Sequence, residues 1–199
     1  MTDHRKRFER WRARLPDKTA YLVDKVLARI VPEFESRGFV WYPDYAGGDS
    51  TQIGANDIPL QRRSGRLWPT VQILFDKRFR PSFNISFAAL PPICKRWKVD
   101  RYVDIPREEA LVFEGPAHFA LCQGRKRNYD CQYGYHWFAL SPRRYLDSEV
   151  EHLRSLLPGL CDLFDSGIPD DWAGRKFGYV TKHILLLESR HDLFFIAKS

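Results

Sequence analysis

Two histidines and two cysteines in the middle of the chain are of the types that bind zinc: His118, Cys122, Cys131 and His136. Tetrahedral zinc needs four ligands that converge on one point. If this segment forms a hairpin around a basic turn at 124–128, Cys131 and His136 lie five residues apart on one strand and face opposite sides of the sheet. We therefore expect no metal site. The same hairpin predicts that Cys122 lies opposite Cys131 as a reduced, unbonded neighbour.

The common catalytic and cofactor-binding motifs are absent from the sequence. No Gly-Lys dipeptide provides a P-loop, no glycines stand two apart as in GxGxxG, and no GxSxG provides a nucleophile elbow. No lysine has Asp, Glu or Gln two places before it, as metal-dependent nucleases of the PD…(D/E)xK kind require. We expect no cofactor and favour a non-enzymatic protein. The alternative is an enzyme with an unrecognised site around His118, Tyr133 and His136.

Arginines provide the remaining binding chemistry, because the guanidinium group matches carboxylates and phosphates. Residues 1–14 carry six basic and two acidic side chains, which is most of the net charge of +7. Further basic or aromatic side chains occupy predicted turns. The candidate binding residues are Arg5, Arg7, Arg12, Arg78, Arg80, Arg96 and Trp97. Successive turns lie at opposite ends of a sheet, so the turns at 62–66 and 76–81 are not expected to form one patch.

The basic N-terminal segment is predicted to be a helix over residues 4–15, because Phe8, Trp11 and Leu15 recur at helical spacing. We expect this stripe to pack on the domain; a membrane-surface or nucleic-acid arm is the alternative. A second helix begins at Pro16-Asp17 with a wide apolar face. Pro32 should interrupt its last turn, and Gly38 should cap its end.

An antiparallel sheet follows from apolar residues at every second place in 71–75 and 82–89. Phe83, Ile85, Phe87 and Ala89 are predicted to face the core, and Ser82, Asn84 and Ser86 the other side. Further strands are expected at 39–42, 57–62, 111–122 and 129–140. Residues 91–110 are expected to be irregular.

A late helix is predicted from the capping box Ser148-x-x-Glu151 and the apolar residues after it, with a break at Pro158-Gly159. The tail after Trp172 fits either a strand or a helix. The fold class is therefore α+β: an antiparallel sheet of about five or six strands, with two N-terminal helices and a late helix packed on one face. We expect a basic N-terminal helix at 1–15 and a single α+β domain at 16–199.

One arrangement of segments resembles known small bacterial domains of unknown function. Glu35-Ser-Arg-Gly-Phe39 closes a helix, and Ile58-Pro-Leu-Gln-Arg-Arg63, Val71-Gln-Ile73 and Phe83-Asn-Ile85 follow as strands. This is similar to domains in which a helix ends in Gly-Phe and leads to an antiparallel sheet, over residues 18–165. The resemblance implies an α+β fold and a bacterial source, and it brings no known active site.

The N-terminus lacks the hydrophobic run of a signal peptide, and no stretch of eighteen apolar residues occurs. We therefore expect a cytoplasmic protein without membrane contact. Its expected function is that of a binding or adaptor domain, of the immunity or defence-associated kind, whose partner is a protein with an acidic surface. Nucleic-acid binding through the basic N-terminal arm is the alternative.

Overall fold

The N-terminal helices form where the sequence predicts, but the first of them ends at Arg12 rather than at residue 15. The computed structural model describes residues 3–41, 55–98, 100–115, 117–123, 133–134, 142–166, 185–188 and 191–197. Helix α1 spans Asp3–Arg12, α2 spans Asp17–Arg29 after Pro16, and the short α3 spans Val31–Glu35. The break between α2 and α3 lies next to Pro32, as predicted. None of the helices in these ranges is both long and apolar enough to cross a membrane.

Gly38 ends α3 through a Schellman motif. Its φ of 81° is open to glycine without strain. Its N–H donates to the Glu35 carbonyl at 3.0 Å, and the N–H of Phe39 donates to the Phe34 carbonyl at 3.1 Å. The rings of Phe34 and Phe39 meet edge to face with centroids 5.3 Å apart. This apolar contact directs the chain from the helix into the sheet.

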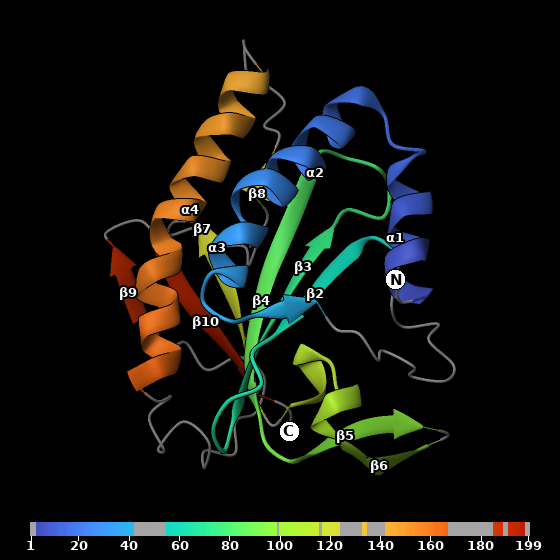
Figure 1. Ribbon diagram of the computed structural model, residues 1–199, viewed down its shortest axis with the longest axis vertical. Coiled ribbons are helices and arrows are strands. Elements are labelled where there is room, and N and C mark those ends of the chain that lie inside the picture. The colour runs from blue at the N-terminus through green and yellow to red at the C-terminus, as the bar shows by residue number, and fades with distance from the viewer. Residues whose placement is uncertain are drawn as a thin grey trace.

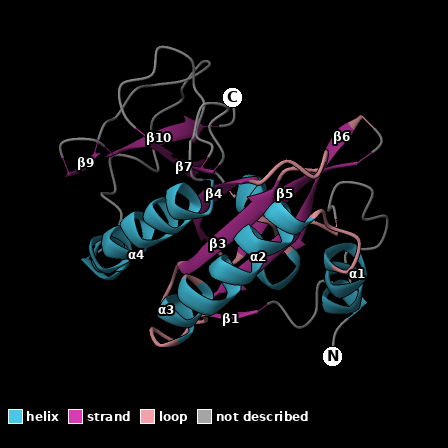
Figure 2. Ribbon diagram, turned by 90° about the horizontal axis from the view of Figure 1, so that it is seen from above, coloured by secondary structure: helices cyan, strands magenta, loops and turns pink. Residues whose placement is uncertain are grey.

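The sheet is antiparallel and confirms the α+β class, with eight strands among the described residues rather than five or six. Its path is β1-β2-β3-β4-β7-β10-β9, and β8 pairs with β4 beside β7. Figure 1 shows this order, and Figure 2 shows that α2 and α4 lie on the same side of the sheet. The strands are β1 (Val40–Trp41), β2 (Asp57–Gln61), β3 (Trp68–Phe75), β4 (Ser82–Leu90), β7 (Ala117–Gln123), β8 (Tyr133–Gly134), β9 (Leu185–Glu188) and β10 (His191–Ala197).

The register places the alternating residues as predicted on the helix-covered face. Ile73 pairs with Ile85, and Val71 pairs with Phe87. Phe83, Ile85 and Phe87 are buried, whereas Asn84 and Ser86 are only partly buried. Two positions of β4 differ from the prediction. Ser82 is buried because β8 pairs beside it, and Ala88, rather than Ala89, is buried in a second core.

This second core corrects the expectation that residues 91–110 are irregular. Strands β5 (Ile93–Lys98) and β6 (Arg101–Pro106) form a separate two-stranded sheet. Two 3₁₀ turns, η1 (Arg107–Glu109) and η2 (Val112–Glu114), follow it. The apolar residues of this region pack on the face of β4 opposite to the helices: Ala88, Leu90, Cys94, Ile105, Ala110 and Val112. The sequences of β5 and β6 do not alternate between apolar and polar residues, because each strand places few apolar side chains in this core.

The predicted hairpin between 111–122 and 129–140 is not the pairing observed. Strand β7 lies between β4 and β10, where Cys122 is opposite Asp192, and Tyr133 and Gly134 pair with β4. Cys131 and His136 lie outside the described residues, so the predicted contact between Cys122 and Cys131 stays a prediction. The other two cysteines, Cys94 and Cys161, are buried and form no disulfide bond, as expected.

Helix α4 spans Pro142–Ser166 and is longer than predicted. Proline is favoured in the first turn, where its missing N–H is not needed. Because the helix begins at Pro142, Ser148 lies inside it. The Ser148 hydroxyl donates to the Tyr145 carbonyl at 2.8 Å and does not cap the helix N-terminus. Pro158 does not end the helix. It lies on the exposed side, where water can serve the carbonyl that loses its partner.

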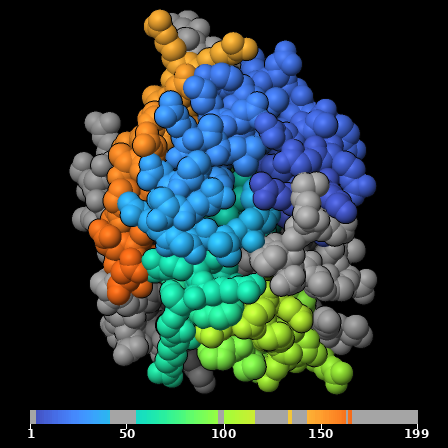
Figure 3. Space-filling view, viewed as in Figure 1, coloured from blue at the N-terminus to red at the C-terminus, as the bar shows by residue number. Residues whose placement is uncertain are grey.

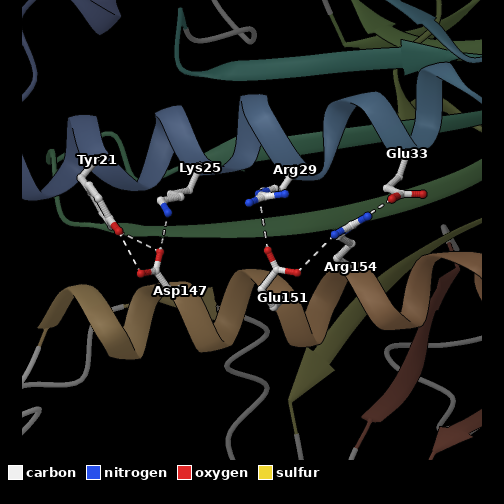
Figure 4. Close-up of polar contacts among 7 residues, drawn as sticks. All are labelled: Tyr21, Lys25, Arg29, Glu33, Asp147, Glu151 and Arg154. Carbon is white, nitrogen blue, oxygen red and sulfur yellow. Dashed lines mark hydrogen bonds and ion pairs between the residues drawn. The ribbon is translucent and has the colours of Figure 1, made fainter.

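Polar contacts along one side of α2 and α4 fix how these two helices lie against each other (Figure 4). The Tyr21 hydroxyl donates to Asp147 at 2.8 Å, and Lys25 Nζ lies 3.0 Å from the same carboxylate. About two turns further along α4, Arg154 donates to Glu33 of α3 at 2.8 Å. The basic side chains of this part of α2 are thus engaged within the fold.

Candidate anion-binding site on the first helix

A buried histidine–aspartate pair fixes α1 against the edge of the sheet. His4 Nε2 lies 2.8 Å from Asp57 Oδ1, and Gln72 Nε2 donates to the other carboxylate oxygen at 2.8 Å. The His4 and Asp57 side chains are 1% and 0% exposed. With Asp57 as acceptor, the imidazole donates from Nε2. The pair is closed to solvent, and its role in this structure is to position α1.

Aromatic packing completes the attachment of α1. Phe8 contacts Trp41 and Phe75 with ring centroids 5.5 and 6.3 Å apart, and Trp11 contacts Phe75 at 5.7 Å. Phe8 and Trp11 are buried and belong to the same core as the sheet. The expectation that the apolar stripe packs on the domain is therefore confirmed. The basic side chains of α1 are thus carried by an element that is packed into the core.

Three arginines of this segment line one open cavity of about 480 Å³: Arg7, Arg10 and Arg14, with Ala55 as a further wall. Residues at spacings of three and seven share one side of a helix. Arg14 lies in the turn after α1, where its N–H donates to the Trp11 carbonyl at 3.0 Å. Arg7 is half-buried, and Arg10 and Arg14 are exposed. Arginine side chains at the wall of a cavity can turn their guanidinium groups towards an anionic ligand.

Among the described residues, the carboxylates near Arg10 and Arg14 pair with another arginine of the same segment. Glu9 and Asp24 both pair with Arg12, at 3.4 and 2.6 Å. In the described part of the chain, neither Arg10 nor Arg14 takes part in an ion pair. An anion that enters the cavity therefore does not have to displace a carboxylate of the described residues from Arg10 or Arg14.

The predicted residues Arg5 and Arg12 lie on α1 but do not line the cavity. The Arg5 guanidinium lies over the ring of Trp41, 4.9 Å from its centroid. Arg12 donates to Asp24 on α2. Of the three arginines predicted in this segment, only Arg7 lines the cavity. Sequence reasoning missed Arg10 and Arg14, although their helical spacing from Arg7 was a usable signal.

Arg78 and Arg80 belong to the β3–β4 turn, which lies against the start of α2. The hydroxyl of Thr19 donates to the Phe79 carbonyl at 2.5 Å. Asp76 organises the turn by accepting from the Arg78 N–H at 2.7 Å and from the Arg80 guanidinium at 3.0 Å. Burial alone would raise the pKa of Asp76, but these hydrogen bonds outweigh burial and hold it below its ordinary value. Because of the hydrogen bond between Thr19 and Phe79, this turn lies at the same end of the molecule as the start of α2.

Arg96 lies at the other end of the molecule, on β5, and is used inside the fold. It donates to the Glu114 carboxylate at 2.6 and 3.0 Å and to the Glu109 carbonyl at 2.6 Å. The two side chains of this ion pair are 11% and 3% exposed. In Figure 3 the N-terminal helices form the blue upper surface and β5–β6 the yellow-green lower end. The side chain of Trp97 lies outside the described part of the structure.

The alternative enzyme site is only partly described. Tyr133 is fully buried, its ring stacks on Phe83 with centroids 5.6 Å apart, and burial raises the pKa of its hydroxyl well above the ordinary value. His136 and the side chain of His118 lie outside the described residues. Within the residues that are described, no group of three His, Cys, Asp or Glu side chains is arranged to hold a metal ion.

Comparison with known proteins identifies no family model that matches this chain, and no match among curated proteins or solved structures.

Proposed function

We propose that this chain is a non-enzymatic binding domain that docks an acidic surface of a partner protein on the arginine cavity, formed by Arg7, Arg10 and Arg14. The observation that carries the proposal is that these three arginines border one open cavity. Arginine binds carboxylates through two parallel hydrogen bonds, and charge-assisted hydrogen bonds are stronger than neutral ones.

The attachment of α1 supports this proposal. His4 and Asp57 are joined inside the protein, and Phe8 is completely buried, so the backbone that carries the arginines is fixed before a partner arrives. A fixed binding element loses less conformational entropy on association. A flexible basic tail would have to be ordered at that moment and would bind less tightly for the same contacts.

Nucleic-acid binding is the second candidate, and one observation favours it. The β3–β4 turn brings Lys77 and Arg78, both exposed, to the end of the molecule where α2 begins. Phosphates of a longer nucleic acid need a basic surface that extends beyond one cavity. Affinity for nucleic acid should then fall steeply with salt and depend on both the turn and α1.

The test uses the full chain and a fluorescent poly-glutamate peptide as a model of an acidic surface. The variant Arg10→Glu/Arg14→Glu should lower the affinity at least about tenfold, because each charge-assisted hydrogen bond contributes about 1.5–3 kcal/mol. The matched control is Arg66→Glu/Arg144→Glu, which makes the same charge change at exposed sites outside the cavity. Equal losses in both variants would show that only net charge matters and would contradict the proposal.

A single-stranded oligonucleotide measured in the same series separates the two candidates. Acidic docking on the cavity predicts tighter binding of the peptide than of the oligonucleotide at equal salt. Tighter oligonucleotide binding that also weakens in Lys77→Glu/Arg78→Glu would instead favour the nucleic-acid function.

A further inference from the structure

We infer that the β3–β4 turn binds a single-stranded nucleic acid, with one base stacked on the ring of Phe79 and phosphates at Lys77 and Arg78. This inference goes beyond the acidic docking proposed above and does not depend on the arginine cavity. It also differs from the second candidate function, because the contact needs only the turn and not α1.

Phe79 has a backbone conformation that is unfavourable for an aromatic residue. Its φ is 60°, in the left-handed region, which is rare for a residue with a bulky side chain. Glycine adopts this conformation without strain. The Phe79 side chain is nevertheless 39% exposed, and within the described part of the chain its ring makes no aromatic or cation–π contact. Packing gives little reason for an aromatic residue at this position, and strain of this kind is often kept where a side chain binds a ligand.

Hydrogen bonds on both sides of Phe79 hold this conformation. The N–H of Phe79 donates to the Asp76 carbonyl at 3.2 Å, and its carbonyl accepts from the Thr19 hydroxyl at 2.5 Å. The turn closes where the N–H of Ser82 donates to the Arg80 carbonyl at 2.8 Å. The ring is therefore carried by a fixed backbone, and a ligand that stacks on it does not have to order the turn.

Two positive charges lie directly before Phe79 in the turn. Lys77 and Arg78 are exposed, and within the residues that the structure describes neither side chain takes part in an ion pair. Arg80 differs, because it pairs with Asp76 at 2.7 Å. The turn therefore offers two cations to a ligand beside one exposed ring.

A nucleotide supplies both kinds of partner in one covalent unit. Its phosphate pairs with lysine or arginine, and its base has a flat face that stacks on an aromatic ring. An acidic peptide would pair with the two cations but need not carry a flat group for the ring. In a duplex the base faces are covered by neighbouring base pairs, whereas a single strand can place an unstacked base on Phe79. The chemistry of the turn therefore favours a single strand.

The test compares two labelled oligonucleotides of equal length and charge, a deoxythymidine nonamer and an abasic nonamer, by fluorescence anisotropy with the full chain. The deoxythymidine form should bind at least about fivefold more tightly, which is the lower end of what one stacked base contributes. This preference should be lost in Phe79→Leu, which keeps an apolar side chain without a flat ring, and kept in Phe79→Tyr. The matched control Tyr102→Leu changes an aromatic side chain that is 49% exposed on β6, and it should keep the preference.

The two cations are tested separately from the ring. Lys77→Gln/Arg78→Gln should weaken the binding of both oligonucleotides alike. It should also lower the slope of log affinity against log salt by about 1.4, because each phosphate contact on a single strand contributes about 0.7. The charge-matched control Arg66→Gln/Arg144→Gln, at exposed sites outside the turn, should leave the slope unchanged. Equal changes of slope in the two variants would contradict the placement of the phosphates at the turn.

Three results would overturn the role of the ring. Equal binding of the deoxythymidine and abasic forms would show that no base is stacked. A preference that persists in Phe79→Leu would place the base elsewhere. A duplex of the deoxythymidine nonamer with its complement that binds more tightly than the single strand, and still depends on Phe79, would contradict the assignment to a single strand.

The poly-glutamate peptide separates this inference from the proposed function. One ring and two cations make a small contact, so the oligonucleotide should bind less tightly than the peptide. The peptide affinity should fall in Arg10→Glu/Arg14→Glu and not in Phe79→Leu. A peptide affinity that depends on Phe79, without a preference for the deoxythymidine form, would assign the turn to the acidic partner and overturn the inference, but would leave acidic docking intact. Peptide binding that the cavity variant does not change, with the deoxythymidine preference retained, would overturn the proposed function alone.

Discussion

Asp57 accepts hydrogen bonds from two buried side chains, and one of them, His4, lies 53 positions away in the sequence at a distance of 2.8 Å. The other donor is Gln72, on the neighbouring strand. The other attachments of α1 to the domain are the packing of Phe8 and Trp11, the Arg5–Trp41 contact and the exposed Arg12–Asp24 ion pair. The polar contact sets which side of α1 faces the core and therefore which arginines face the cavity.

Removing this carboxylate should loosen α1. Asp57→Ala leaves two buried donors without their acceptor, and we expect the free energy of unfolding to fall by about 2–5 kcal/mol. Urea unfolding followed by fluorescence measures it. The control Asp24→Ala removes the exposed partner of Arg12 and should cost less than about 1 kcal/mol. Similar losses in the two variants would contradict a structural role for the buried pair.

Phe8 should be among the side chains on which stability depends most. It is fully buried, and Phe8→Ala leaves a cavity between α1 and the sheet, with an expected loss of about 3–5 kcal/mol. Phe79→Ala is the matched control, because the Phe79 side chain is 39% exposed, and should cost less than about 1 kcal/mol. Thermal unfolding of both variants checks this prediction. If Phe8→Ala unfolds at the same temperature as the wild type, the prediction that α1 is part of the core is wrong.

The packing of Phe8 and Trp11 means that deleting the N-terminal segment would alter the core as well as the charge. Deletion of residues 1–14 removes the basic side chains, but it also removes Phe8 and Trp11 from the core and uncovers Phe75. A loss of binding after truncation therefore does not by itself locate the binding site. Charge substitutions on the exposed side of α1 avoid this problem.

The elements that the sequence predicts well are those whose pattern is local. The sequence predicts strand β4 because burial of one face requires apolar residues at every second position. It predicts the end of α3 because the positive φ at this position favours glycine, here Gly38. The sequence of strand β5 shows no alternation of apolar and polar residues. Its inward residues include Arg96, whose burial depends on Glu114 eighteen positions later. Ser148 was misplaced because an interior serine can also bond to a helical carbonyl and then resembles a cap.

The candidate site was predictable only in part, for a related reason. A basic helix at the N-terminus and its apolar stripe followed from spacing within the segment. Which arginines face a cavity depended on the rotation of α1, and this rotation is fixed by Asp57 and Phe75 from distant strands. The prediction therefore identified Arg7 and omitted Arg10. It also included Arg96, whose guanidinium is engaged with Glu114.

Acid should weaken the β3–β4 turn through Asp76. The pKa of Asp76 lies below its ordinary value in the folded protein, so the contribution of this group is present above the unfolded value of about 3.8 and is lost as the pH falls through the folded value. Asp76→Asn should therefore be less stable than the wild type at pH 6, and the difference should shrink towards pH 3. Urea unfolding at pH 6, 4 and 3 measures the trend. Asp104→Asn, at an exposed carboxylate, should show little difference at any of these values.

The adjacent residues Lys95 and Arg96 allow the last prediction to compare an exposed with a buried ion pair on one strand. Lys95 pairs with Asp104 at 2.6 Å, and both side chains are 62% exposed. Arg96 pairs with Glu114 at the same distance in the interior, and Glu114 also accepts from the Leu111 N–H at 2.8 Å. Lys95→Ala should cost less than about 1 kcal/mol, because water and salt screen an exposed pair.

Arg96→Ala should cost about 3–5 kcal/mol, because it leaves the Glu114 carboxylate buried without its positive partner. The double variant Arg96→Met/Glu114→Leu should recover much of this loss, since it removes both charges and fills the space with apolar groups. Urea unfolding of the three variants and the wild type measures these differences. Peptide affinity, measured under conditions where each variant is folded, should not change, because Arg96 acts in the second core and not in the arginine cavity. If Arg96→Ala is as stable as the wild type but no longer binds the peptide, Arg96 belongs to the binding surface, and its structural role is contradicted.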